Sequence, residues 1–216
     1  MAEEHGTALI PGWFPEFAGA VVRQLPRDID QGIANGWSEN QAALKKVLRE
    51  VLMPDDGSTA KFKVWKTIKL GLRKSPQEYR KALLAGKYQI GTYANQILDK
   101  IPVSNEEVEV DLARVSGRQL GFKVNTRRDV IYERALELGL QQCPAEVGPA
   151  LREQYTDQPM REWVLIGMDP IAGSDGGLDV FRVGRLDDGQ WLRSSHGDPD
   201  FVWYPGLQWV FVLPSK

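Results

Sequence analysis

The sequence predicts an α+β fold, in which N-terminal and central helices pack on a C-terminal antiparallel β-meander. Apolar residues recur at helical spacing in the earlier part of the chain, most clearly over 38–52. After residue 160 the chain changes to short runs rich in Val, Leu, Ile, Trp and Phe, separated by Asp-Gly turn signals. Helices first and a meander afterwards are typical of an α+β domain with its helices on one face of the sheet.

Residues 1–55 are predicted to form a helical segment that docks on the main domain. Three prolines in the opening residues leave room for only a short helix at 15–24. Ser38 and Gln41 have the spacing of a capping box, and the helix that follows carries five large aliphatic side chains on one stripe. Burial of such side chains is worth about 1.5–3 kcal/mol each, so we expect this stripe to be covered.

The main domain is predicted to span residues 60–216, after a hinge at 55–59. Its first element is a strand within 61–71, where basic and apolar residues alternate. A capping box places a helix between Ser75 and Gly86, and Thr126 with Asp129 is expected to cap another. The helix that follows Thr126 is expected over 127–138, and a further short helix at 90–100. The further strands are expected at 107–115, 162–168, 178–185, 190–193 and 207–213, the last four forming the meander (about 162–213).

The stretch 139–155 is predicted to be an elbow that leads from the helices to the sheet. Gly139 stands where a left-handed residue ends a helix, so that Leu140 can fold back on Ala135. Pro144 restricts the residue before it to an extended conformation. Pro149 cannot lie deep inside a helix, so a turn at 144–148 and a helix from about 149 are expected to be distinct.

The composition excludes several kinds of site. A net charge of -2 over 216 residues gives no general attraction to nucleic acid or membranes. One cysteine excludes a disulfide and a multi-cysteine zinc site, and two histidines exclude a histidine-rich metal site. No phosphate-binding or dinucleotide-binding glycine motif is present, so no cofactor is expected. Because the sequence has neither a signal peptide nor an apolar run long enough to span a membrane, we expect a cytoplasmic protein with no membrane partner.

A basic stretch at 61–81 is the first candidate for a binding site. It mixes cations with aromatic rings, as a surface that contacts phosphates and stacks on bases would. On this interpretation the protein is a non-enzymatic interaction or adaptor module for a protein partner or nucleic acid, and its binding residues are Lys63, Trp65, Lys66, Lys69 and Arg73. The simpler interpretation, which we favour, is a solvated face that balances the acidic C-terminal half. The spacing of Ala82 and Gly86 leaves a helix-turn-helix as a further hypothesis.

The alternative function is a hydrolase or transferase with a site around 143–158. A nucleophilic cysteine needs a base and a positive environment, and only His5 and His196 could supply an imidazole. The residues of this alternative site are Cys143, Glu146, Arg152, Tyr155 and His196. The simpler interpretation is a half-buried cysteine that packs as a small apolar side chain. An enzyme is therefore the less favoured class.

Four runs of the sequence resemble a family of uncharacterised bacterial proteins. The runs are "GWSENQAALKKVLREVLMP", "KFKVWKTIKLG", "LGLQQCPAEVGPALREQY" and "DQPMREWVLIGMDPI", and the likeness extends from about residue 25 to the end. The resemblance implies a bacterial, cytoplasmic, stand-alone protein. It implies no activity, cofactor or catalytic residue.

Overall fold

The computed structural model describes residues 14–23, 25–52 and 62–214 of the chain. The chain divides into two compact units, Met1–Gly57 and Ser58–Lys216, and each is described by itself. The expected hinge at 55–59 lies outside the described residues, as does His5. Docking of the N-terminal segment on the main domain therefore stays a prediction.

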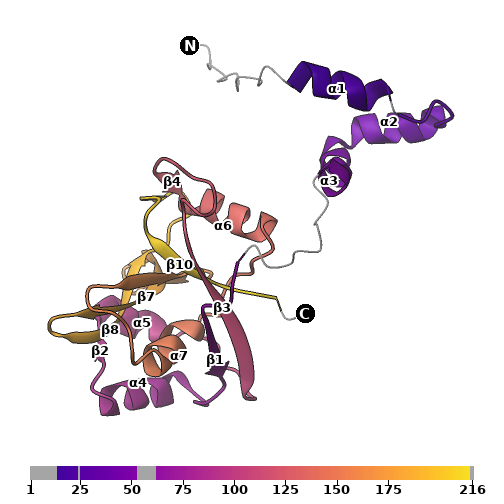
Figure 1. Cartoon of the computed structure of the whole chain (residues 1–216). Helices are drawn as coiled ribbons and strands as arrows, with labels where there is room; N and C mark the ends of the chain where they lie inside the picture. The colour runs from indigo at the N-terminus through magenta and orange to yellow at the C-terminus, as the bar shows by residue number, and fades with distance from the viewer. Residues whose placement is uncertain (1–13, 24, 53–61, 215–216) are drawn as a thin grey trace. The chain divides into compact units, whose positions relative to one another are not determined.

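The N-terminal unit contains the helices α1 Phe14–Arg23, α2 Gln31–Glu39 and α3 Gln41–Leu52 (Figure 1). Helix α1 confirms the short helix expected at 15–24. Helix α2 was not expected from the sequence. Its N-cap is Asp30, whose carboxylate accepts hydrogen bonds from the backbone N–H groups of Gly32 at 2.8 Å and Ile33 at 3.3 Å.

The capping box expected at Ser38 and Gln41 is wrong. Ser38 lies in the last turn of α2, where its hydroxyl donates to the carbonyl oxygen of Ala34 at 3.0 Å. The cap of α3 is Asn40, whose side-chain oxygen accepts the N–H of Ala43 at 3.0 Å. The helix expected over 38–52 is therefore confirmed as α3, with its start moved to Gln41.

The main domain is built on an eight-stranded mixed sheet that curls into a half-barrel (Figure 1). Its strand order is β1-β3-β10-β5-β7-β8-β2, and β6 pairs with β7. The strands are β1 Lys66–Leu70, β2 Gln89–Ile90, β3 Val108–Ser116, β5 Trp163–Ile166, β6 Ile171–Ala172, β7 Leu178–Leu186, β8 Gly189–His196 and β10 Gln208–Val212, while β4 Thr126–Arg127 and β9 Val202–Trp203 form a separate pair. The α+β class is confirmed.

The purely antiparallel meander is wrong. Strand β10 runs parallel to β5, and β2 runs parallel to β8. Strand β10 lies in the middle of the sheet because both of its faces are apolar: Trp209, Val210 and Phe211 are fully buried. Strands β7 and β8 form a hairpin joined by Asp187 and Asp188, and β6 and β7 form another across residues 173–177, as the two turn signals predict.

Helices cover both faces of the sheet, so the expectation of helices on one face is also wrong. One face packs against α4 Pro76–Ala85, α5 Thr92–Leu98 and α7 Val147–Gln154, and the other against α6 Arg128–Glu137. The two hydrophobic clusters alternate along the central strands β3, β5 and β10: Val164 of β5 belongs to the first cluster and Leu165 to the second. This division follows from the alternation of side chains along a strand.

The helix signals of the main domain are partly confirmed. Ser75 caps α4 by accepting the N–H of Glu78 at 3.2 Å, and Gly86 follows the last helical residue. The cap expected at Thr126 and Asp129 is wrong, because Thr126 lies in β4 and its hydroxyl donates to the carbonyl oxygen of Val124 at 2.9 Å.

The elbow is confirmed with one change of boundary. Gly139 has a φ of 84°, and the N–H of Leu140 donates to the carbonyl oxygen of Ala135 at 3.0 Å, which closes the end of α6. Helix α7 begins at Val147, two residues earlier than expected. Pro149 fits there because it is the third helical residue, whose N–H would have no partner within the helix.

Candidate binding groove

Several cationic side chains of the basic stretch bind partners within the main domain. Lys66 Nζ lies 3.0 Å from a carboxylate oxygen of Asp157, and Arg73 forms an ion pair with Glu153. The bond from Lys66 holds the pKa of the Asp157 carboxyl below its usual range. Lys74 Nζ donates to the carbonyl oxygens of Gly71 at 2.8 Å and Asn105 at 2.9 Å. These contacts favour the interpretation of this segment as a face that is balanced by acidic residues of the C-terminal half.

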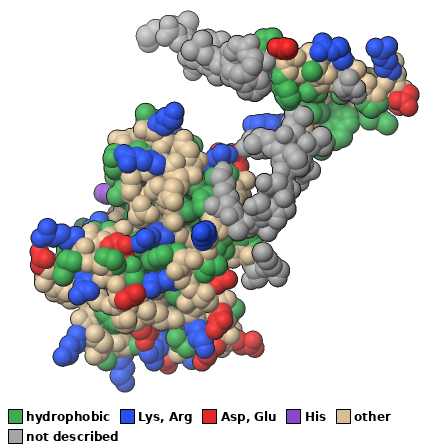
Figure 2. Space-filling model, viewed as in Figure 1, with side chains coloured by type: hydrophobic (Ala, Val, Ile, Leu, Met, Phe, Trp, Pro, Cys, Tyr) green, Lys and Arg blue, Asp and Glu red, His purple; other side chains and the backbone are tan. Residues whose placement is uncertain are grey.

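Two lysines and the aromatic ring of the predicted binding residues remain. Lys63 and Lys69 are exposed, and their side chains form no ion pair with the residues that the structure describes. Trp65 packs edge-on against Tyr155, with 5.1 Å between ring centroids, so its ring is used inside the domain. On the face that carries α4, α7 and β1, cationic and anionic side chains are interspersed (Figure 2). The stretch thus offers isolated cations rather than a basic field.

The helix-turn-helix hypothesis does not fit the second of its two helices. Strand β2 lies between α4 and α5. Ala94, Ile97 and Leu98 of α5 are fully buried, so this short helix contributes to the core. A recognition helix would have to present one side to a DNA groove.

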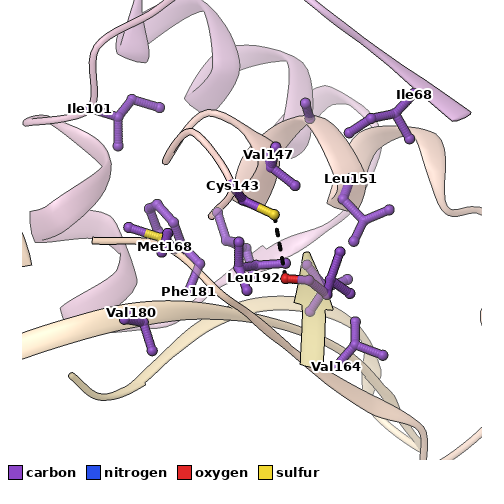
Figure 3. Close-up of a cluster of buried hydrophobic side chains, with 14 of the residues drawn as sticks. Ile68, Ile101, Cys143, Val147, Leu151, Val164, Met168, Val180, Phe181 and Leu192 are labelled. Carbon is purple, nitrogen blue, oxygen red and sulfur yellow. Dashed lines mark hydrogen bonds between the residues drawn. The ribbon is translucent and has the colours of Figure 1, made fainter. Parts of the chain in front are cut away.

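Cys143 is a core residue. Its thiol points into a cluster of apolar side chains that includes Val147, Leu151 and Phe181, and it lies 3.4 Å from the carbonyl oxygen of Val210 (Figure 3). Burial raises the pKa of the thiol, which disfavours the thiolate that nucleophilic attack requires. His196 stacks instead on Phe201, with 4.6 Å between ring centroids.

Glu146 is buried and ties separate loops together. Its carboxylate accepts four hydrogen bonds: from the N–H of Gly71 at 2.8 Å, the hydroxyl of Tyr79 at 2.7 Å, the N–H of Ser104 at 2.8 Å and the hydroxyl of Ser104 at 2.7 Å. Four donors to one carboxylate compensate for its removal from water. The role that this geometry gives Glu146 is structural.

Arg152 and Tyr155 are buried in the same elbow. Arg152 donates to the side chains of Gln158 and Gln190 and to the carbonyl oxygens of Tyr155 and Gly184. Burial lowers its pKa to about 10, which leaves the guanidinium charged at neutral pH. The hydroxyl of Tyr155 donates to Glu162 at 2.6 Å. The elbow is filled, and its polar groups bond to one another, apart from the buried Nε of Arg152, which has no partner among the described residues.

A second pair of arginines has a different environment. Arg182 of β7 and Arg193 of β8 are directly opposite each other in the register of the hairpin. Within the described residues, neither guanidinium forms a hydrogen bond or an ion pair, and the buried Nε of Arg182 has no partner. Burial and the charge of Arg193 lower the pKa of Arg182. We call these two residues the arginine pair.

Tryptophan rings hold the arginine pair in place. The guanidinium of Arg182 lies 4.5 Å from the ring centroid of Trp163, and that of Arg193 lies 4.0 Å from the centroid of Trp191. Such cation–π contacts are worth about 0.5–1 kcal/mol at exposed sites and more when desolvated. Gly184 makes this arrangement possible, because a Cβ at that position would lie 2.1 Å from the ring of Trp163.

The arginine pair lines an open hollow of about 380 Å³. The hollow lies between the start of α5, at 91–94, and the strands β7 and β8. Trp191 forms part of its wall, and Tyr93 contributes a ring that is 53% exposed. Two unpaired guanidiniums beside the ring of Trp191 and the exposed ring of Tyr93 form a surface suited to a flat or anionic group.

A second hollow of about 590 Å³ adjoins the first and shares Tyr93, Arg182 and Ser194 with it. Its other end is acidic and contains the carboxylates of Asp175, Asp179 and Asp198. Burial, together with the charges of Asp175 and Asp198, raises the pKa of Asp179, while a hydrogen bond from Ser194 and the nearby His196 oppose this rise. We call the two hollows together the groove.

Of the candidate site residues expected from the sequence, His196 alone lines the groove in the part of the chain that the structure describes. The two arginines are single basic residues in strands eleven positions apart, and each looks like an ordinary surface cation of a β-hairpin. A signal was present in the pattern Trp191-x-Arg193 and Arg182-x-Gly184, which places rings and cations on one face of a hairpin. It could be interpreted only with the register and with the position of β5 beside β7.

No family model, curated protein or solved structure matches the chain. The resemblance to a bacterial family therefore stays a prediction. In the part of the chain that the structure describes, no group of three or more His, Cys, Asp or Glu side chains could hold a metal ion. None of the described helices is long and apolar enough to cross a membrane.

Proposed function

We propose that this protein is a non-enzymatic binding module that recognises an anionic group of a partner through Arg182 and Arg193. The observation that carries the proposal is the lack of any counter-ion for these two arginines among the described residues. Like charges directly opposite each other on neighbouring strands are destabilising. A bound carboxylate or phosphate would remove that repulsion and accept hydrogen bonds from both guanidiniums.

The groove supports this function better than the basic stretch does. Lys66 and Arg73 already form ion pairs with acidic residues, whereas both guanidiniums of the arginine pair are available to bind an anion. Tryptophan, tyrosine and arginine are also the residues that contribute most to binding energy at protein interfaces. A hydrolase or transferase at 143–158 has no comparable support, because the elbow is filled. A bacterial, cytoplasmic protein remains our proposal from the resemblance.

Benzoate is a suitable probe for the first test, because it combines a carboxylate with a flat ring. Its binding can be followed from the broadening of its own NMR signals as protein is added. We expect weak binding by the wild type that falls with added salt and that Arg193→Gln reduces about tenfold, the effect of losing about 1.4 kcal/mol.

The matched control is the double variant Lys63→Gln with Lys69→Gln, which removes the exposed lysines of the basic stretch. It should bind benzoate as the wild type does. Equal binding by wild type and Arg193→Gln, or a loss confined to the lysine variant, would contradict the proposal. Thermal unfolding of each variant shows whether it is folded.

A further inference from the structure

We infer that the ligand of the groove is a peptide segment of a partner protein that carries both an acidic and a basic side chain, rather than a nucleic acid. This inference rests on the proposed function and adds the chemical class of the ligand. It follows from the charges at the two ends of the groove, and from the rings between them.

The first end attracts an anion. The two guanidiniums of the arginine pair lie opposite each other without a counter-ion in the described residues. A carboxylate presents two oxygens in the geometry that a guanidinium fork matches. The ring of Trp191 packs against the guanidinium of Arg193 beside that contact and holds it in position.

The second end attracts a cation. Asp175, Asp179 and Asp198 line one hollow, and no lysine or arginine other than Arg182 lines it with them. A lysine or arginine side chain entering there would be attracted by three carboxylates. Phe201, which is 37% exposed and stacks with His196, offers an apolar surface for the aliphatic part of such a side chain.

Nucleic acid does not satisfy both ends. A phosphate chain could bind the arginine pair, but its next phosphates would enter the acidic hollow and be repelled by the three carboxylates. The net charge of -2 adds no general attraction for a polyanion. The positively charged track that single-stranded nucleic acid follows is therefore missing on one side of the arginine pair.

The strand geometry sets the spacing of the two charges on the ligand. Asp179 and Arg182 are three residues apart on β7, which corresponds to roughly 10 Å along a strand. Side chains that point to the same face of an extended peptide are an even number of residues apart, and the first such spacing that covers this distance is four residues, roughly 13 Å. The expected ligand is thus an extended segment with an acidic residue and a basic residue four positions apart.

The test uses fluorescence anisotropy with four labelled probes of matched length. They are a peptide with one glutamate and one lysine at this spacing, a peptide with two glutamates, a peptide with two lysines, and oligodeoxythymidine. We expect the mixed-charge peptide to bind the full-length wild type about tenfold more tightly than the other three probes.

Two variants identify the ends of the groove. Arg193→Gln and Asp198→Asn should each weaken binding of the mixed-charge peptide several-fold. Asp198→Asn should also strengthen binding of oligodeoxythymidine, because it removes one source of repulsion. Arg161→Gln is the matched control, since Arg161 is an exposed arginine that pairs with Asp187 outside the groove.

The outcomes separate this inference from the proposed function. Oligodeoxythymidine that binds as tightly as the mixed-charge peptide would overturn the inference, and so would a peptide affinity that Asp198→Asn leaves unchanged. If no peptide binds while benzoate still depends on Arg193, the inference is wrong and the proposed function stands. If benzoate binding does not depend on Arg193, both are wrong.

Discussion

Among the described residues, four ionisable side chains that are buried or partly buried fall into two kinds, according to whether the fold supplies their partners. Glu146 accepts four hydrogen bonds, and Arg152 donates to four oxygens, all from within the domain. Arg182 and Arg193 receive only the faces of tryptophan rings. Residues of the first kind hold the fold together, whereas the second kind is suited to a partner from outside.

Substitutions of Glu146 test its structural role. Glu146→Ala should lower the free energy of unfolding by about 3–5 kcal/mol, because it leaves the buried hydroxyl of Tyr79 and two backbone N–H groups without an acceptor. Glu146→Gln keeps one acceptor oxygen and should cost less. Urea unfolding followed by circular dichroism measures both changes, and equal effects of the two variants would contradict this role.

Residue chemistry alone predicted some of these roles. The sequence indicated that Cys143 would pack as a small apolar side chain and that the stretch around it would be an elbow, because proline and glycine already defined the path of the backbone there. It could not show that the arginine pair lacks counter-ions, since that property depends on every neighbour that the fold supplies.

Among the elements, the hairpin of β7 and β8 is the one that positions the groove. It places Arg182 opposite Arg193, and its Gly184 leaves room for Trp163 of β5 to lie across the strand. The helix α5 then closes the side of the first hollow with Tyr93. The groove therefore depends on the β7–β8 hairpin, on β5 and on α5, which come from separate parts of the sequence.

Gly184→Ala tests this role of the hairpin. The added methyl group would meet the ring of Trp163 at 2.1 Å, so the ring must move and its contact with Arg182 must change. We expect a loss of stability of about 1–3 kcal/mol from overpacking, together with weaker binding of benzoate. Gly176→Ala is a control for an added methyl group, because Gly176 has open space around its Cβ direction, although its positive φ carries its own strain. Unchanged benzoate binding in Gly184→Ala would contradict the role of Trp163.

Element types were easier to predict from the sequence than their neighbours. The strands near 162–168, 178–185 and 207–213 exist because β-branched and aromatic residues cluster there. The order of these strands in the sheet does not follow from the sequence, since β10 could be the last strand of a meander or a central strand. The burial of both faces of Trp209, Val210 and Phe211 decides this, and it depends on covering helices that the sequence does not place.

Over the whole molecule, charge is balanced locally rather than by region. The basic stretch and the acidic residues after it neutralise each other in pairs such as Lys66 with Asp157, and the overall charge is -2. The arginine pair differs from these residues because it has no acidic partner among the described residues. The carboxylates that line the adjoining hollow form a second concentration of one charge. A module with both in one groove can select a partner by the order of its charges.

The most direct test of the groove as a binding site is an arginine-selective NMR titration of the full chain with benzoate. The side-chain Nε–Hε signals report each guanidinium separately. We predict that the signals of Arg182 and Arg193 shift together with a single affinity, while that of the buried Arg152 stays in place. If instead the signals of Arg73 or the amides of Lys63 and Lys69 shift while those of the arginine pair stay in place, the groove is not the binding site.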